Sequence, residues 1–236
     1  MDDRSTPRQR IAAAIPAYQA APSVGAVVEG ALRVLPDVLV VDDGSTDGTA
    51  AAARSAGARV VSLPFNQGKG AALAVAFRTL LGEGFTAVVT LDADGQHLPE
   101  EIPRLLAAAE HADLVLGVRD HLFAEMSGLR RASNRLSSTA ISFAAGQRLS
   151  DVQTGFRFYS GRLLAEVGFP ESRFEAESAV VVRAVRRGFR VVTVPVRLGF
   201  ADGRTTSHYR PLVDSLRIAG AVLHARIQAL RWGRSS

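Results

Sequence analysis

The sequence predicts a single α/β domain that is built on a mostly parallel, Rossmann-like sheet with helices on both faces. Short apolar runs alternate with helical segments five times over the first half of the chain. Apolar strands that are separated by helices are typical of a parallel sheet covered on both faces. A polar turn follows each of the first four strands, and ligands of such sheets bind beyond the carboxyl ends of the strands. The 236 residues, of which 47% are hydrophobic and 22% charged, have the composition of a globular domain.

The individual elements follow from the apolar runs, the helix caps and the positions of glycine and proline. Strands are expected at 11–15, 37–41, 59–63, 86–91, 113–118 and 190–194. Helices are expected at 23–35, 48–56, 68–81, 99–110, 127–145 and 175–187, and a last helix from about 211. Ser23 is expected to cap the first helix, and Asp47 or Thr46 the second.

No linker or repeat divides the chain, so 10–210 is expected to form one domain and 211–236 a C-terminal amphipathic helix with a basic tail. Residues 201–236 contain six arginines and two aspartates, and thus carry +4 of the net charge of +5. Apolar residues recur there at three- and four-residue steps, which predicts one apolar stripe. This helix either packs on the sheet or lies in the membrane interface, with Trp232 at the level of the lipid headgroups.

Several classes of protein are excluded by composition. The chain has no cysteine, which excludes disulfides, thiolate metal sites and cysteine nucleophiles. No signal peptide is visible, and the longest uncharged run, 11–28, contains Pro16, Gln19 and Pro22, so we expect no membrane-spanning segment. Aromatic residues make up only 6% and are not clustered, which argues against binding of nucleic acid. We expect a cytoplasmic protein, with peripheral contact to the cytoplasmic face of the membrane as an open alternative.

Two carboxylates follow the fourth strand as a D-x-D motif, Asp92 and Asp94. Alternate residues of an extended segment point the same way. Two carboxylates on one side, together with the oxygens of a diphosphate, make a site for a hard cation such as Mg²⁺ or Mn²⁺. The position after an apolar strand favours this reading over a simple acidic turn.

Two further polar turns lie at the expected carboxyl edge of the sheet. Asp42 and Asp43 follow the second strand, where an acidic residue can accept hydrogen bonds from a ribose or a base. Segment 66–70 opens the third helix, and its glycines expose backbone N–H groups at a helix N-terminus, which favours anions. Lys69 in this segment is the only lysine of the chain, which favours a role in binding a nucleotide. The segment lacks the first glycine and the Ser/Thr of a Walker A loop.

Four motifs occur in order, VVDDGSTDGT, NQGKGAAL, LDADGQH and DVQTGFRFY. Together they resemble the family 2 inverting glycosyltransferases of the GT-A fold, and most of all the dolichyl- or polyprenyl-phosphate mannose and glucose synthases. The resemblance covers about residues 10–210. It implies transfer of a hexose from a nucleotide diphosphate sugar (a GDP- or UDP-sugar) to a polyprenyl phosphate at the cytoplasmic membrane face, with Mg²⁺ or Mn²⁺ as cofactor.

The resemblance also assigns site residues. It implies a metal site of Asp92, Asp94 and Gln153. For the nucleotide sugar it implies Pro16, Tyr18, Asp42, Asp43, Asp92 and Arg157, to which we add Lys69 and, from a loop suited to act as a lid, His208. For the acceptor phosphate it implies Arg119, Arg148 and Ser150. Asp94 and Arg119 are the expected catalytic residues.

The chain departs from the family in two motifs. PAYQA stands where P-x-Y-N-E is common, so Gln19 and Ala20 replace an amide and a carboxylate, and Thr154 stands where serine is usual, which is a mild change. The acceptor also stays open. A hydroxyl acceptor needs a general base, for which Glu175 or Glu177 is the candidate, whereas a phosphate is already anionic and needs none. His97 is either a diphosphate or acceptor contact or a structural residue of its turn. A non-catalytic nucleotide-sugar binding protein is the alternative from another class, and the D-x-D motif and Gln153 argue against it.

Overall fold

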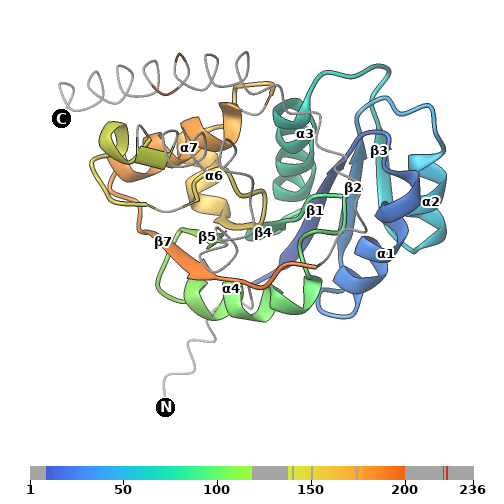
Figure 1. Ribbon diagram of the computed structural model, residues 1–236, viewed down its shortest axis with the longest axis horizontal. Helices are drawn as coiled ribbons and strands as arrows, with labels where there is room; N and C mark the ends of the chain where they lie inside the picture. Colours follow the sequence, from blue (N-terminus) through green and yellow to red (C-terminus); the bar gives the residue numbers. More distant parts are fainter. Residues whose placement is uncertain are drawn as a thin grey trace.

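The computed structural model describes residues 9–118, 138–139, 141–149, 151–173, 175–199, 220 and 222. In this part of the chain, seven strands form one sheet in the order β3-β2-β1-β4-β6-β5-β7 (Figure 1). The strands are β1 (Ile11–Ala17), β2 (Val38–Asp42), β3 (Arg59–Ser62), β4 (Ala87–Thr90), β5 (Leu114–Val118), β6 (Arg157–Ser160) and β7 (Val191–Pro195). The predicted α/β class is confirmed.

The sheet is mostly parallel, as predicted. β1 pairs in parallel with β2 and β4, β2 with β3, and β5 with β7. The exception is β6, which runs antiparallel between β4 and β5, so that Thr90 and Leu116 both lie opposite Arg157. β6 is not among the predicted elements, because a four-residue strand that begins with arginine lacks the apolar run that marks the other strands. Its insertion places the segment before it, 151–156, beside the carboxyl end of β4.

Helices cover both faces of the sheet, which confirms the prediction (Figure 1). On one face lie α1 (Ala21–Leu32), α2 (Thr49–Ser55), a short 3₁₀ turn η1 (Pro99–Glu101) and α4 (Ile102–Ala109). On the other lie α3 (Lys69–Gly82), α6 (Gly161–Val167) and α7 (Glu175–Arg186). Buried side chains fill both interfaces: Val28 and Leu105 pack with Val40 on the first face, and Leu73 and Val181 with Leu39 on the second.

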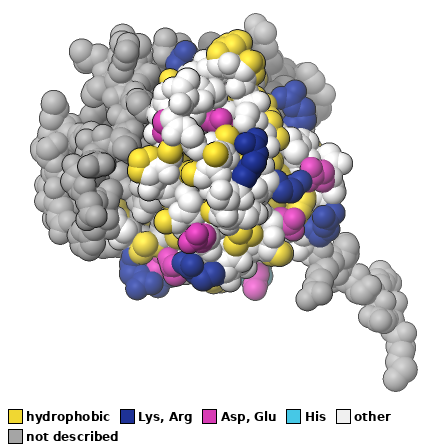
Figure 2. Space-filling view, turned by 90° about the vertical axis from the view of Figure 1, so that its right-hand side faces the viewer, with side chains coloured by type: hydrophobic (Ala, Val, Ile, Leu, Met, Phe, Trp, Pro, Cys, Tyr) yellow, Lys and Arg dark blue, Asp and Glu magenta, His cyan; other side chains and the backbone are white. Residues whose placement is uncertain are grey.

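The side of the molecule that carries α1, α2 and β3 shows basic and acidic side chains interspersed (Figure 2). Two exposed ion pairs lie among them, Arg33–Glu100 at 3.5 Å and Arg59–Glu83 at 2.8 Å. Exposed pairs of this kind contribute little to stability. Arg33 and Arg59 are therefore each paired with a neighbouring carboxylate.

Element boundaries agree with the predicted ranges to within a few residues for the first five strands and the helices between them, but the caps differ. The N-cap of α1 is Ala20 rather than Ser23, whose hydroxyl instead donates to the carbonyl of Ala93 at 2.7 Å. The N-cap of α2 is Gly48, in the left-handed region at φ 88°, and Asp47 accepts from the Thr49 N–H. Most of the helix expected at 127–145, and most of the one expected from 211, lie outside the described residues. Of the second helix, Gly220 and Val222 are described and helical, and the Val222 side chain is buried in the apolar core that also contains Leu73.

Within the described ranges, no helix has the length and apolar character that crossing a bilayer requires.

Candidate active site

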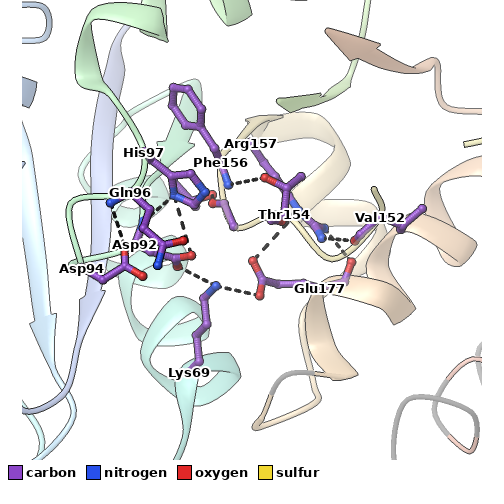
Figure 3. Close-up of polar contacts among 12 residues, drawn as sticks. Lys69, Asp92, Asp94, Gln96, His97, Val152, Thr154, Phe156, Arg157 and Glu177 are labelled. Carbon is purple, nitrogen blue, oxygen red and sulfur yellow. Dashed lines mark hydrogen bonds and ion pairs between the residues drawn. The ribbon is translucent and has the colours of Figure 1, made fainter. Parts of the chain in front are cut away.

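The D-x-D motif follows β4 at the carboxyl edge of the sheet, where the turn of 92–97 folds back on itself (Figure 3). Asp94 Oδ1 accepts the Gln96 N–H at 3.0 Å, and Asp94 Oδ2 has no partner among the described residues. The Asp92 N–H donates to His97 Nδ1 at 3.1 Å. Asp94 thus offers an open carboxylate oxygen, and the backbone of Asp92 is fixed by the imidazole.

Lys69, at the start of α3, joins the D-x-D motif to α7. Its Nζ lies 2.6 Å from Asp92 Oδ1 and 2.9 Å from Glu177 Oε2 (Figure 3). Burial of the ammonium by itself lowers the pKa of Lys69, but the two carboxylates outweigh it and raise that pKa above its ordinary value. The ammonium is therefore charged and held between two carboxylates. Its predicted contact with the nucleotide stays a prediction.

Gly155 lies directly against one side of the Asp92 carboxylate. A Cβ at this position would lie 2.5 Å from both carboxylate oxygens of Asp92 and 2.7 Å from Lys69 Nζ. The carbonyl of Gly155 accepts the Thr90 hydroxyl at 2.8 Å, which ties the segment before β6 to the end of β4. Glycine is thus required here by close approach to the Asp92–Lys69 pair.

His97 is buried and contacts three other parts of the chain. Its ring stacks on Phe156, with centroids 5.4 Å apart and an interplanar angle of 22°. Its backbone forms a β-bridge with Leu198, beyond β7. Because Nδ1 accepts a backbone N–H, the neutral ring carries its proton on Nε2. His97 therefore joins the D-x-D turn to the segment before β6 and to the segment after β7.

Arg157 corrects a residue assignment made from the sequence. Its side chain is 0% exposed, and the guanidinium donates to the backbone carbonyls of Val152 at 2.7 Å, Thr154 at 2.7 Å and Glu177 at 2.5 Å. A guanidinium enclosed in this way has no face to offer to a nucleotide phosphate. Its role is to tie β6 and the segment before it to α7.

The two candidate general bases lie on the first turn of α7. Glu177 is 4% exposed, and its Oε1 lies 4.0 Å from Arg157 Nε without a hydrogen-bond partner among the described residues. Its other oxygen is held by Lys69. Glu175 Oε2 is likewise buried and unpartnered within the described part of the chain. A carboxylate that is buried and ion-paired, as Glu177 is, is poorly placed to take a proton from an incoming hydroxyl.

The N-terminus of α3 is partly occupied by the protein itself, and the anion site expected there stays a prediction. Asp43 accepts the N–H of Gln67 at 2.8 Å and of Gly68 at 2.7 Å, and Ala71 donates to the carbonyl of Ser172 at 2.8 Å. Burial raises the pKa of Asp43 above its ordinary value, although the two N–H groups act in the opposite direction. Asp43 is therefore engaged in holding this turn rather than facing a nucleotide.

The glycines of this turn serve close packing. A Cβ on Gly68 would lie 2.6 Å from the carbonyl oxygen of Ser172, and a Cβ on Gly70 would lie 2.6 Å from that of Glu171. Gly68 also has φ 102°. Segment 171–173, which leads into α7, is thus seated on the start of α3.

The PAYQA turn after β1 has a role that the sequence analysis missed. Gln19, at φ 51°, donates its N–H to the Ser45 hydroxyl at 2.9 Å and its side-chain amide to the Thr46 hydroxyl at 3.1 Å. Ser45 in turn donates its N–H to Asp42 Oδ1 at 3.1 Å. The departure from the family motif thus fastens the turn after β1 to the turn after β2. No sequence pattern marks a contact between these two turns.

The remaining predicted residues are distributed as follows. Pro16 lies in β1 opposite Val41, and Tyr18 follows that strand. Arg148 is exposed. Gln153 Nε2 is buried and has no hydrogen-bond partner among the described residues. The residues that lie outside the described ranges are Arg119, Ser150 and His208.

The side chains at the D-x-D turn offer oxygen ligands for a divalent cation. Within the described ranges, no three His, Cys, Asp or Glu side chains converge as a metal site. The carboxylates of Asp92 and Asp94 are nevertheless hard oxygen ligands on alternate residues of one turn, and one oxygen of Asp94 is unpartnered among the described residues. Gln153 brings a buried amide without a partner in that part of the chain. These residues fit Mg²⁺ or Mn²⁺ provided that a substrate supplies further oxygens.

Comparisons with known proteins identify the family. The chain is 32% identical over 242 residues to the undecaprenyl-phosphate mannosyltransferase of Micrococcus luteus, covering 95% of this chain and 94% of the relative. It is 31% identical to the polyprenol monophosphomannose synthase of Mycolicibacterium smegmatis, covering 80% and 77%. Glucosyl-3-phosphoglycerate synthase of Mycobacterium tuberculosis, solved with Mn²⁺, UDP and phosphoglyceric acid, has the same fold, at a TM-score of 0.72, 22% identity and coverage of 93% and 79%. The sequence model named Glycosyl transferase family 2 matches residues 13–168, and the chain belongs to this family of GT-A glycosyltransferases.

Proposed function

We propose that this glycosyltransferase transfers a hexose from a nucleotide diphosphate sugar to a polyprenyl phosphate. The observation that carries the proposal is the D-x-D turn, in which Asp94 keeps an unpartnered oxygen among the described residues at the carboxyl edge of the sheet. The names of the two relatives, which match most of the chain, support a polyprenyl phosphate as acceptor.

Asp92, Asp94 and Gln153 would hold the divalent cation. The cation would neutralise the departing diphosphate, a contribution of several kcal/mol in the transition state. The chain's own residues prepare this site: His97 fixes the backbone of Asp92, and Lys69 fixes its carboxylate.

A phosphate acceptor needs no general base, and this agrees with the carboxylates around the site. Its oxygen is already anionic, so it attacks the anomeric carbon without a general base and inverts the configuration. Glu177 is buried and ion-paired with Lys69, which is the environment of a structural carboxylate rather than a base. Arg119, Arg148 and Ser150 are proposed to hold the acceptor phosphate.

The acceptor places the reaction at a membrane surface. We propose that the protein contacts the cytoplasmic face peripherally, through the basic segment 211–236. A chain ending at Tyr209 should stay folded and bind the nucleotide sugar, but should no longer sediment with anionic liposomes. Aggregation of the shortened chain, or a much lower melting temperature, would assign the segment to the core of the domain.

A transfer assay in detergent tests the function. Labelled GDP-mannose, UDP-glucose and other GDP- and UDP-sugars are each offered with undecaprenyl phosphate, with the matching polyprenol, and with 3-phosphoglycerate. Transfer to the polyprenyl phosphate alone, lost in excess EDTA, with an inverted anomeric centre by NMR, is the expected result. Transfer to the polyprenol or to 3-phosphoglycerate would instead establish a hydroxyl acceptor.

A further inference from the structure

Three charged side chains from three separate elements share one contact beside the D-x-D turn. Lys69 comes from α3, Asp92 follows β4, and Glu177 lies on α7 (Figure 3). The ammonium lies 2.6 Å from one carboxylate and 2.9 Å from the other. Two carboxylates and one ammonium leave this group with a net charge of −1.

Each of the three is held by its own surroundings. The backbone at Lys69 is fixed between the Asp43 carboxylate on one side and the carbonyl of Ser172 on the other. Gly155 closes over the Asp92 carboxylate without room for a Cβ. The backbone carbonyl of Glu177 accepts from the buried Arg157 guanidinium. The ammonium therefore stands at a defined point between the two carboxylates.

We infer that Glu177 is a positioning residue that acts through Lys69 on the D-x-D carboxylate of Asp92. By sharing the ammonium, Glu177 prevents Lys69 from forming an exclusive ion pair with Asp92. Asp92 thereby keeps part of its negative charge and a fixed orientation for a divalent cation. The inference rests on the proposed use of a divalent metal, and it assigns Glu177 a role other than that of general base.

The geometry favours this role over direct contact with substrate. One oxygen of Glu177 is bound to Lys69, and the other is buried 4.0 Å from Arg157 Nε. Neither oxygen is open to solvent in a way that would admit an acceptor hydroxyl. Without the Glu177 carboxylate, the Lys69 ammonium would pair with Asp92 alone. Its positive charge would then oppose the binding of a cation at Asp92.

Direct Mn²⁺ titration, followed by electron paramagnetic resonance with and without saturating GDP or UDP, tests the inference. Glu177→Gln keeps the shape and removes the charge, and should weaken Mn²⁺ binding by about 10- to 100-fold, as expected for an outer residue that orients a metal ligand. Glu177→Asp keeps the charge and should recover part of the affinity. Glu166→Gln, which removes a carboxylate of the exposed Arg162–Glu166 pair on α6, should leave it unchanged.

A double-mutant cycle separates action through Lys69 from independent action. In a Lys69→Met background, the further change Glu177→Gln should have close to no effect on Mn²⁺ affinity. Effects of the two substitutions that simply multiply would overturn the inference, as would unchanged binding in Glu177→Gln. Thermal unfolding of each variant identifies those that fail to fold. If Glu177→Gln or Lys69→Met does not fold, Glu177→Asp or Lys69→Gln takes its place in the Mn²⁺ titration. A wild-type protein that binds no Mn²⁺ would overturn the metal proposal and the inference with it.

Discussion

Two glycine-containing turns lie at the same edge of the sheet and serve opposite purposes. In the turn before α3, NQGKG, the N–H groups of Gln67 and Gly68 donate to the Asp43 carboxylate, and the glycines pack against segment 171–173. The turn after β4, DADGQH, keeps one oxygen of Asp94 without a partner among the described residues. Both turns combine glycines with polar residues in sequence. The two turns differ in whether another segment of the chain forms hydrogen bonds with their polar groups.

The largest loss of activity should come from a change in the DADGQH turn after β4. Asp94→Asn removes a carboxylate from the proposed metal site, and should lower kcat/KM by about a thousandfold, which corresponds to about 4 kcal/mol of transition-state stabilisation. Because Asp94 is not part of the core, the melting temperature should stay close to that of the wild type. Near-normal turnover in the labelled-sugar assay would remove Asp94 from the site.

A smaller loss of activity should follow from crowding the Asp92 carboxylate. Gly155→Ala places a methyl group 2.5 Å from both oxygens of Asp92, so the carboxylate must turn away from Lys69. We expect kcat/KM to fall by about tenfold or more, as for loss of an interaction that orients a metal ligand. Activity and melting temperature are measured together, and a variant with lowered stability but normal activity would contradict this account.

A change in the turn before α3 should lower the stability of the fold rather than the activity. Gly70→Ala drives a Cβ to within 2.6 Å of the Glu171 carbonyl, a backbone atom that cannot move aside cheaply, and should cost about 1–3 kcal/mol in the free energy of unfolding. Gly82→Ala in the same helix meets nothing within 4 Å and is the matched control. Urea denaturation of both variants decides the matter: equal stabilities would mean that segment 171–173 is not tightly seated.

The smallest effect is expected in a third turn, after β2. Slight burial acts to raise the pKa of Asp47, but hydrogen bonds from Thr49 and Ala21 outweigh it and lower that pKa below 3.8. A lowered carboxyl pKa stabilises the folded state above the unfolded value, and this contribution disappears as the pH falls through the folded pKa. The stability difference between wild type and Asp47→Asn should therefore be full at pH 6 and shrink below about pH 3.8. A difference that does not change with pH would contradict this.

The sequence predicted the first five strands and the helices between them because each strand there is a continuous apolar run. It also placed the D-x-D motif correctly at the end of β4. β6 escaped prediction because its strand character comes from its neighbours β4 and β5, which lie far away in sequence. Local pattern cannot reveal pairing of this kind.

The misassigned residues share a second cause. Arg157 and Asp43 carry charges that suggest a ligand, yet both are satisfied by backbone groups of the protein itself. A buried charge needs such partners, and they become visible only once the chain is folded. The pairing of Lys69 with Glu177 is of the same kind, because it joins two helices that are far apart in sequence.

The position of β6 has a consequence for the order in which the protein assembles during synthesis. Thr90 of β4 lies opposite Ala14 of β1 on one side and Arg157 of β6 on the other. As the chain emerges from the ribosome, β1 to β4 can pair early, but β4 stays an open edge until β6 has been made. Pairing between distant segments is slow, and unpaired edges promote aggregation. The early sheet of β1 to β4 thus has two unpaired edges: β3 remains an edge of the finished sheet, whereas β4, the strand that presents the D-x-D motif, is covered only when β6 has been made.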